Sequence, residues 1–94
     1  MRLHGNVQKR LAEARAEILR LRETLRVLDE QVAYQQGVAD DATTRATVAG
    51  TPLADRERRE AVEDLRRLKR QRGETAARID ELTSEQDALL DRLG

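Results

Sequence analysis

The chain has 94 residues, of which 38% are charged and 1% are aromatic. This length allows one domain at most, and so few large apolar side chains exclude a globular core of ordinary shape. Eighteen basic and eighteen acidic residues cancel, so no overall field favours nucleic acid or an anionic membrane.

Composition also bounds the location of the protein. No stretch approaches the roughly 20 apolar residues that span a bilayer, and the first ten residues lack the apolar segment of a secretory signal. We therefore expect a cytoplasmic protein that does not contact membranes. The absence of cysteine excludes disulfides and thiolate metal sites. Sixteen Arg against two Lys, with abundant Ala, indicate a GC-rich and bacterial genome.

The first half of the chain carries a heptad pattern. Apolar residues recur at alternating steps of four and three from Val7 to Val32, and the pattern continues in weaker form to Ala46. It predicts one helix over about 6–49, with Asn6 as its N-cap. We call these positions the first seam: Val7, Leu11, Ala14, Ile18, Leu21, Leu25, Leu28, Val32, Gln35, Ala39, Ala42 and Ala46.

A strong turn signal follows. Gly50 suits the position after a helix end, Thr51 suits an N-cap and Pro52 suits the first position of a helix. The turn is therefore placed at 50–51 and a second helix at about 52–93. The second seam has the same spacing: Ala54, Arg58, Ala61, Leu65, Leu68, Arg72, Thr75, Ile79, Leu82, Gln86, Leu89 and Leu93.

The two seams match when the chain folds back at the turn. Each seam position then faces a seam position of the other helix, as in the pairs Val7 with Leu93 and Ala39 with Ala61. The sequence thus predicts an all-α fold, a two-helix antiparallel coiled-coil hairpin formed by residues 1–94 as a single domain. The same register predicts flanking ion pairs of Asp29 with Lys69 and of Arg45 with Glu57.

Apolar residues outside the seams predict an interface. Val27, Tyr34 and Val38 follow heptad spacing on another face of the first helix, and Val62 and Leu90 lie outside the seam of the second. A lone hairpin would leave such residues partly exposed, and exposed apolar stripes mark contact surfaces. We expect these five to form an interface, with the hairpin dimerising into a four-helix bundle, and Tyr34 to be its anchor.

Catalysis finds no support in the residue types. The chain has one Ser, Ser84, and one His, His4, far apart in sequence. Two helices offer no concavity that could hold a substrate between carboxylates. No His pair or acidic loop has metal-ligand spacing, and no Gly-rich phosphate loop is present. We expect no enzyme activity, no metal and no cofactor.

A cluster of cations offers a different function. Residues 66–72 hold five positive charges, which could bind phosphate or carboxylate groups: Arg66, Arg67, Lys69, Arg70 and Arg72. We call this set the arginine band. It predicts nucleic-acid or nucleotide binding if the cations are free, and a solvated helix face if carboxylates nearby neutralise them. The chain lacks the aromatic residues on which bases stack.

One spacing resembles a known family. Glu60, Arg67 and Gln71 fall at the intervals of a motif in actinobacterial anti-sigma factors that bind cyclic di-GMP on an antiparallel helical hairpin. The serine of that motif corresponds here to Asp64 and its final aspartate to Thr75, and the first helix has no counterpart. The similarity covers sixteen residues. It implies a nucleotide-binding hairpin, but we do not assign the chain to this family.

The functional hypothesis from sequence is a coiled-coil interaction protein. It would act as an adaptor, scaffold or regulator by dimerising or by docking helix to helix on another protein. The alternative is phosphate binding through the arginine band, which salt should weaken steeply. A third possibility is recognition of the hairpin at its tip, where Val48 and Leu53 flank the turn.

Overall fold

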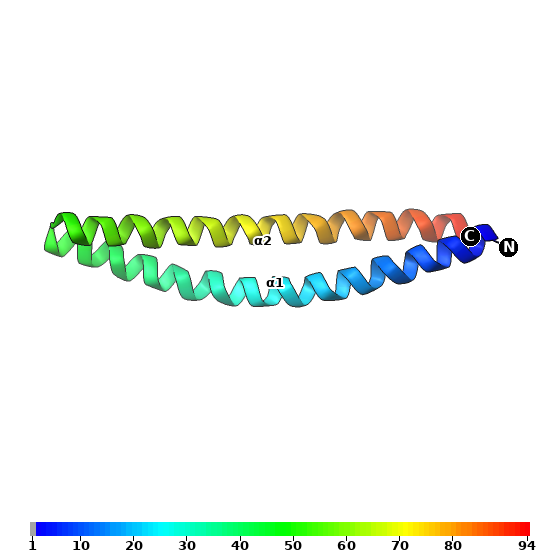
Figure 1. The fold of residues 1–94 in the computed structure, drawn as a ribbon, viewed down its shortest axis with the longest axis horizontal. Coiled ribbons are helices and arrows are strands. Elements are labelled where there is room, and N and C mark those ends of the chain that lie inside the picture. Colours follow the sequence, from blue (N-terminus) through cyan, green and yellow to red (C-terminus); the bar gives the residue numbers. More distant parts are fainter. Residues whose placement is uncertain (1) are drawn as a thin grey trace. The chain divides into compact units, whose positions relative to one another are not determined.

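The structure is a computed structural model that describes residues 2–94, with side chains described from residue 5 onward. It consists of two helices, α1 (Arg2–Ala49) and α2 (Pro52–Leu93), which pack against each other (Figure 1). No strand occurs among the described residues. The predicted all-α hairpin is confirmed.

Helix α1 begins earlier than predicted. It starts at Arg2, so Asn6 lies inside the helix and its predicted role as N-cap is wrong. No proline interrupts this stretch, and Gly5 is its residue of lowest helix propensity. A single glycine costs a helix about 1 kcal/mol relative to alanine, which is too little to end it here.

The turn at Gly50 is built as its residue types require. Gly50 has φ of 61° and donates its backbone N–H to the Ala46 carbonyl at 3.0 Å, which closes the end of α1. The Thr51 hydroxyl accepts the backbone N–H of Ala54 at 3.2 Å, as an N-cap does. Pro52 then occupies the first position of α2, where no N–H is needed.

The last turns of α1 contain three threonines, a residue type of low helix propensity. The hydroxyls of Thr43, Thr44 and Thr47 each donate to the backbone carbonyl four residues earlier, at 2.8 to 3.1 Å. These bonds keep the hydroxyls satisfied within the helix, so that α1 continues to Ala49.

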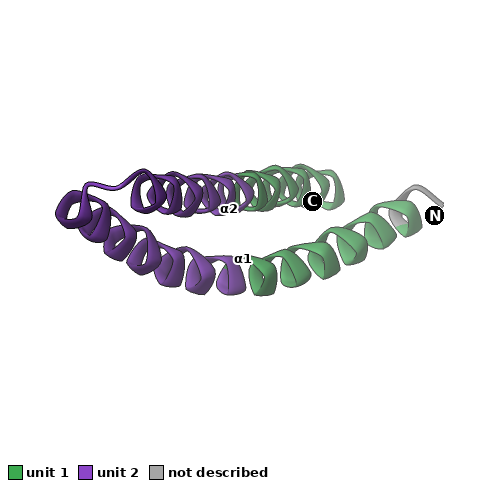
Figure 2. Ribbon diagram, turned by 60° about the vertical axis from the view of Figure 1, so that its left-hand side comes forward, with its two compact units in different colours: residues 1–25, 74–94 green, residues 26–73 purple. Residues whose placement is uncertain are grey.

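The two helices divide into two compact units (Figure 2). Unit 1 consists of residues 1–25 and 74–94, and unit 2 of residues 26–73. In the part of the chain whose side chains are described, every buried hydrophobic residue belongs to one of the two seams. These buried residues are Val7, Ala14, Ile18, Leu82 and Leu89 in unit 1, and Leu28, Ala39, Ala42, Ala61 and Leu65 in unit 2.

Ion pairs flank the seam in unit 1. Arg10 pairs with Glu85 at 3.1 Å, and Arg78 pairs with Glu17 at 3.5 Å. Arg78 also reaches Glu81 on its own helix at 3.2 Å. The hydrogen bond to Glu81, and secondarily the charge of Glu17, raise the pKa of Arg78 above its ordinary value. These exposed pairs contribute little stability, but they join the two helices in one register.

Unit 2 is packed around small residues. Ala39, Ala42 and Ala61 form a buried cluster with Leu65, against which Val32, Val38 and Val62 pack. Alanine at facing positions lets two helices approach closely.

Two arginines occupy seam positions of unit 2. Arg58 is half-buried, and its guanidinium pairs with Asp55 at 2.9 Å. Arg72 is the one exposed seam residue within the described chain, and its Nε donates to Asp29 on α1. Both side chains carry their charge outward from the seam, which avoids burying an unpaired cation.

The predicted ion pairs are wrong. Asp29 pairs with Arg72 and not with Lys69, because the long Arg72 side chain leaves its seam position and reaches the carboxylate first. Arg45 and Glu57 line the same open depression in unit 2, but they form no ion pair in the described part of the chain.

Each unit joins a basic helical segment to an acidic one. In unit 1, residues 5–25 hold five basic and three acidic residues, whereas residues 74–94 hold two basic and six acidic. In unit 2, residues 26–49 hold two basic and four acidic residues, and residues 52–73 hold eight and five. Opposite net charges in each unit favour the antiparallel pairing over its parallel alternative.

Candidate functional site

The described residues hold no group of three or more His, Cys, Asp or Glu side chains that could bind a metal ion. Ser84 is exposed on α2. The side chain of His4 lies outside the described side chains. The depressions found on the two units are shallow and open to solvent.

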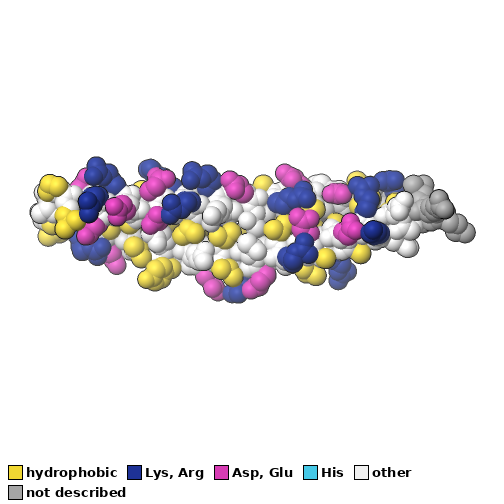
Figure 3. Space-filling model, viewed as in Figure 1, with side chains coloured by type: hydrophobic (Ala, Val, Ile, Leu, Met, Phe, Trp, Pro, Cys, Tyr) yellow, Lys and Arg dark blue, Asp and Glu magenta, His cyan; other side chains and the backbone are white. Residues whose placement is uncertain are grey.

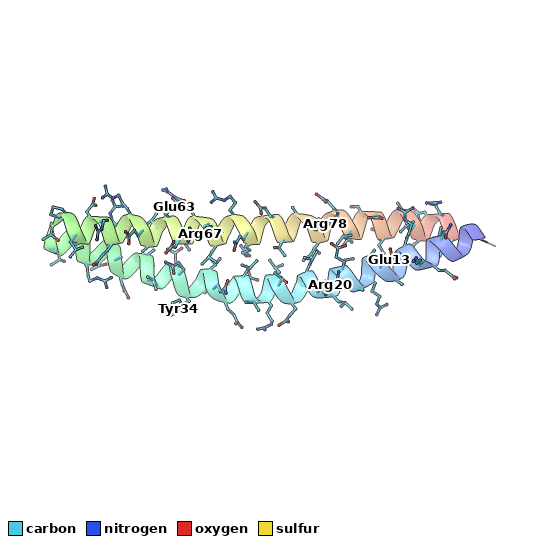
Figure 4. The ribbon with its side chains drawn as sticks, in the orientation of Figure 1. Glu13, Arg20, Tyr34, Glu63, Arg67 and Arg78 are labelled. Atoms are coloured by element: carbon cyan, nitrogen blue, oxygen red, sulfur yellow. The ribbon has the colours of Figure 1, made fainter. Side chains whose placement is uncertain are left out.

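Tyr34 is the most prominent apolar side chain outside the seams and away from the turn. Its side chain is 76% exposed and points from α1 to the side opposite α2 (Figure 4). Val27, seven residues earlier on the same helix face, is 37% exposed. Beside the ring lies an open depression of about 420 Å³, which is also lined by Glu30, Gln31 and Leu68.

The five predicted interface residues are divided between the two units. Tyr34, Val27 and Val38 share a face of α1 in unit 2, although Val38 is half-buried against the alanine cluster. Val62 is half-buried against the same cluster from α2. Leu90 belongs to unit 1, where its side chain is 51% exposed. Three of the five residues therefore share one face.

Charges surround this face in equal numbers. Arg26 pairs with Glu30 at 2.7 Å, and Asp41 and Arg45 are exposed without an ion pair among the described residues. The other carboxylates nearby are already engaged within the unit, since Asp29 bonds Arg72 and Asp40 accepts a hydrogen bond from Gln36 at 3.0 Å. We call the residues that surround Tyr34 the Tyr34 face: Arg26, Val27, Glu30, Gln31, Tyr34, Gly37, Val38, Asp41 and Arg45.

The sequence reasoning missed one exposed apolar residue in unit 1. Leu19 is exposed on α1, next to Arg15, Ile18 and Arg22, with which it lines a shallow depression. Leu19 belongs neither to the first seam nor to the predicted interface residues of α1. A large apolar residue at an outward heptad position was the signal that could have identified it.

The arginine band is partly neutralised. Arg66 pairs with Glu63 at 3.7 Å, Arg67 pairs with Asp64, and Arg72 pairs with Asp29. Asp64 stands where the cyclic di-GMP motif has a serine. Its carboxylate forms the ion pair with Arg67, so the guanidinium of Arg67 is already engaged within α2.

The remaining cations of the band, Lys69 and Arg70, are exposed and form no ion pair within the described chain. Charged side chains of both signs intermingle on the face of the molecule that Figure 3 presents.

The turn carries a second exposed apolar pair. Val48 is 83% exposed and Leu53 is 57% exposed, on either side of Gly50. Neither side chain belongs to the seam, so the hairpin's own packing does not account for them.

Over the described residues, neither helix has an apolar run long enough to cross a membrane. The chain matches no protein-family model, no curated protein and no solved structure.

Proposed function

We propose that this chain is a non-enzymatic interaction module that docks a helix of another protein chain on the Tyr34 face. It would act in the cytoplasm as a small adaptor, scaffold or regulator, because docking needs only a complementary helical surface.

One observation carries the proposal: Tyr34 is the sole aromatic residue of the chain, and 76% of its side chain is left exposed. The hairpin's own seams use other residues, so intramolecular packing does not require a large apolar group at this position. Aromatic side chains bury about 150 to 250 Å² each and dominate interface energetics. Tyr34 with Val27 and Val38 therefore supplies the apolar centre that a docking helix needs.

A photo-crosslinking experiment tests the proposal. A photoreactive phenylalanine analogue replaces Tyr34 in the full chain, which is then irradiated in its native host. We expect a discrete protein adduct. The matched control carries the same analogue at Ser84, which is exposed on α2 and lies outside the Tyr34 face. Equal adducts from both positions, or none from position 34, would contradict the proposal.

Phosphate binding through the arginine band is a second candidate, and Lys69 and Arg70 support it. They are adjacent exposed cations without ion pairs in the described part of the chain. Binding of a nucleotide or nucleic acid should then weaken as salt rises and be lost in the double variant Lys69→Gln, Arg70→Gln. Binding that persists at high salt, or that survives in the variant, would contradict it.

A further inference from the structure

We infer that the helix docked on the Tyr34 face is α1 of a second copy of this chain, antiparallel to the first and related by a two-fold axis at Tyr34. This inference rests on the proposed function and names its partner.

The net charge of the face favours a second copy. Arg26 and Arg45 balance Glu30 and Asp41, so the Tyr34 face is neutral around an apolar centre. A strongly charged partner gains nothing from such a surface, whereas a neutral face can meet its own copy without net repulsion.

The order of the charges selects the antiparallel orientation. Asp41 lies seven residues after Tyr34, and Arg26 lies eight residues before it. A two-fold axis at Tyr34 brings residues at equal distances before and after it together, so Asp41 of one copy faces Val27 of the other, with Arg26 of that copy one residue further along the helix. Glu30 then meets Val38 of the other copy. A parallel arrangement would instead place Glu30 against Glu30 and Asp41 against Asp41.

Gly37 provides a second observation. It lies inside α1, three residues after Tyr34, where glycine costs a helix about 1 kcal/mol relative to alanine. Beyond its chain neighbours and the adjoining backbone of its own helix, a Cβ at Gly37 would meet no described atom within 4 Å, so the hairpin itself does not need a glycine there. A missing side chain beside Tyr34 leaves room for the Tyr34 ring of the second copy.

Cysteine crosslinking tests the orientation, because the chain contains no cysteine of its own. A disulfide requires Cα atoms within about 7 Å. We expect Tyr34→Cys to form a covalent dimer under mild oxidation, and Val27→Cys alone to form none. An equimolar mixture of Val27→Cys and Asp41→Cys chains should give the mixed dimer. Ser84→Cys reports the rate of random collision.

The outcomes separate the alternatives. Covalent homodimers from both Tyr34→Cys and Val27→Cys would indicate a parallel contact and overturn the antiparallel arrangement. If the mixture of Val27→Cys and Asp41→Cys chains, which keeps Tyr34, crosslinks no faster than Ser84→Cys, the second copy is overturned as partner. If photo-crosslinking at position 34 then captured a different protein, the proposed function would survive that failure, and without any adduct both would fall.

Two glycine variants test the contact while Tyr34 stays in place. Gly37→Gln and Gly73→Gln both replace a mid-helix glycine whose Cβ would meet no atom within 4 Å. Both should raise the thermal stability of the monomer at high dilution. Gly37→Gln alone should also weaken the dimer by about tenfold or more in sedimentation equilibrium, because its side chain intrudes into the contact. Equal dimer affinity in the two variants would overturn the proposed contact.

Discussion

Gln35 of α1 donates its side-chain amide to the backbone carbonyl of Ala61 on α2, with 3.1 Å between Nε2 and the oxygen. Gln35 occupies a seam position, so its amide would lose hydrogen bonds to water without gaining any if this bond were absent. The bond also ties one residue of α1 to one residue of α2. Alanine side chains are too small to interlock and fix how α1 is aligned along α2. The hydrogen bond therefore helps to specify the register of the two helices at the alanine cluster.

The first prediction concerns this bond. Gln35→Ala should lower the free energy of unfolding by about 1 kcal/mol, the net value of a typical hydrogen bond. Gln36→Ala is the matched control, because the side chain of Gln36 donates to Asp40 of its own helix and not to α2 among the described residues. Such a pair contributes about 0.2 to 0.5 kcal/mol and alanine is the better helix former, so this change should be close to neutral. Urea denaturation of both variants measures the difference, and equal losses would contradict the interhelical role.

The second prediction concerns the turn. Gly50 has φ of 61°, where a side chain costs about 1 to 2 kcal/mol. Gly50→Ala should therefore lower the melting temperature. Gly73→Ala should raise it, because Gly73 lies inside α2 and its Cβ would meet no atom within 4 Å. Thermal unfolding followed by circular dichroism compares them, and a shift of the same sign in both variants would refute the strained turn.

Much of the fold could be predicted, because the heptad spacing identifies the buried residues and the turn residues set the ends of the two helices. Leu82 and Leu89 are buried where the second seam places them, and the helix ends at Gly50 and Pro52 follow from backbone chemistry specific to these two residue types. The start of α1 was not predictable from Asn6, since a good N-cap residue does not end a helix that its neighbours can extend.

The side-chain partners were less accessible to sequence reasoning. Arg72 occupies a seam position, but its long side chain extends out of the seam. It forms an ion pair with Asp29, the carboxylate that we expected to pair with Lys69. Val38 and Val62 were expected on an outer surface, yet both are half-buried against the alanine cluster. Because the alanine side chains are small, the helices lie close together and residues beside the seam come into contact with it. The opposite charges of the paired segments become visible only once the partner of each segment is known.

The third prediction concerns pH. The hydrogen bond from Arg58, with the charges of Arg58 and Arg59, lowers the pKa of Asp55 below its ordinary value. A carboxyl group with a lowered pKa in the folded state stabilises the fold above its unfolded pKa, near 3.9, and this contribution is lost as pH falls through the folded value. Asp55→Asn should thus destabilise the chain at neutral pH and not at the acid end of this window.

NMR titration of the Asp55 carboxyl measures the same effect directly. Arg58→Gln should raise the pKa of Asp55 towards its ordinary value, because it removes the bond of 2.9 Å to the carboxylate. Arg56→Gln is the control, since Arg56 pairs with Glu60 and not with Asp55. An Asp55 pKa that moves equally in the two variants would show that general charge, and not the Arg58 bond, sets its value.

The fourth prediction tests how closely the helices approach in unit 2. Ala39 is 3% exposed in the cluster with Ala61 and Leu65, so leucine at this position adds three carbons where no space is left. Overpacking of this kind costs about 1 to 3 kcal/mol. Ala39→Leu should lower the free energy of unfolding by that amount, although leucine is more apolar and almost as good a helix former. Ala12→Leu, at an exposed position of the same helix, should change it by less than about 0.5 kcal/mol. A more stable Ala39→Leu variant would mean that the helices separate easily to admit the side chain, and that the alanine cluster does not hold them at close range.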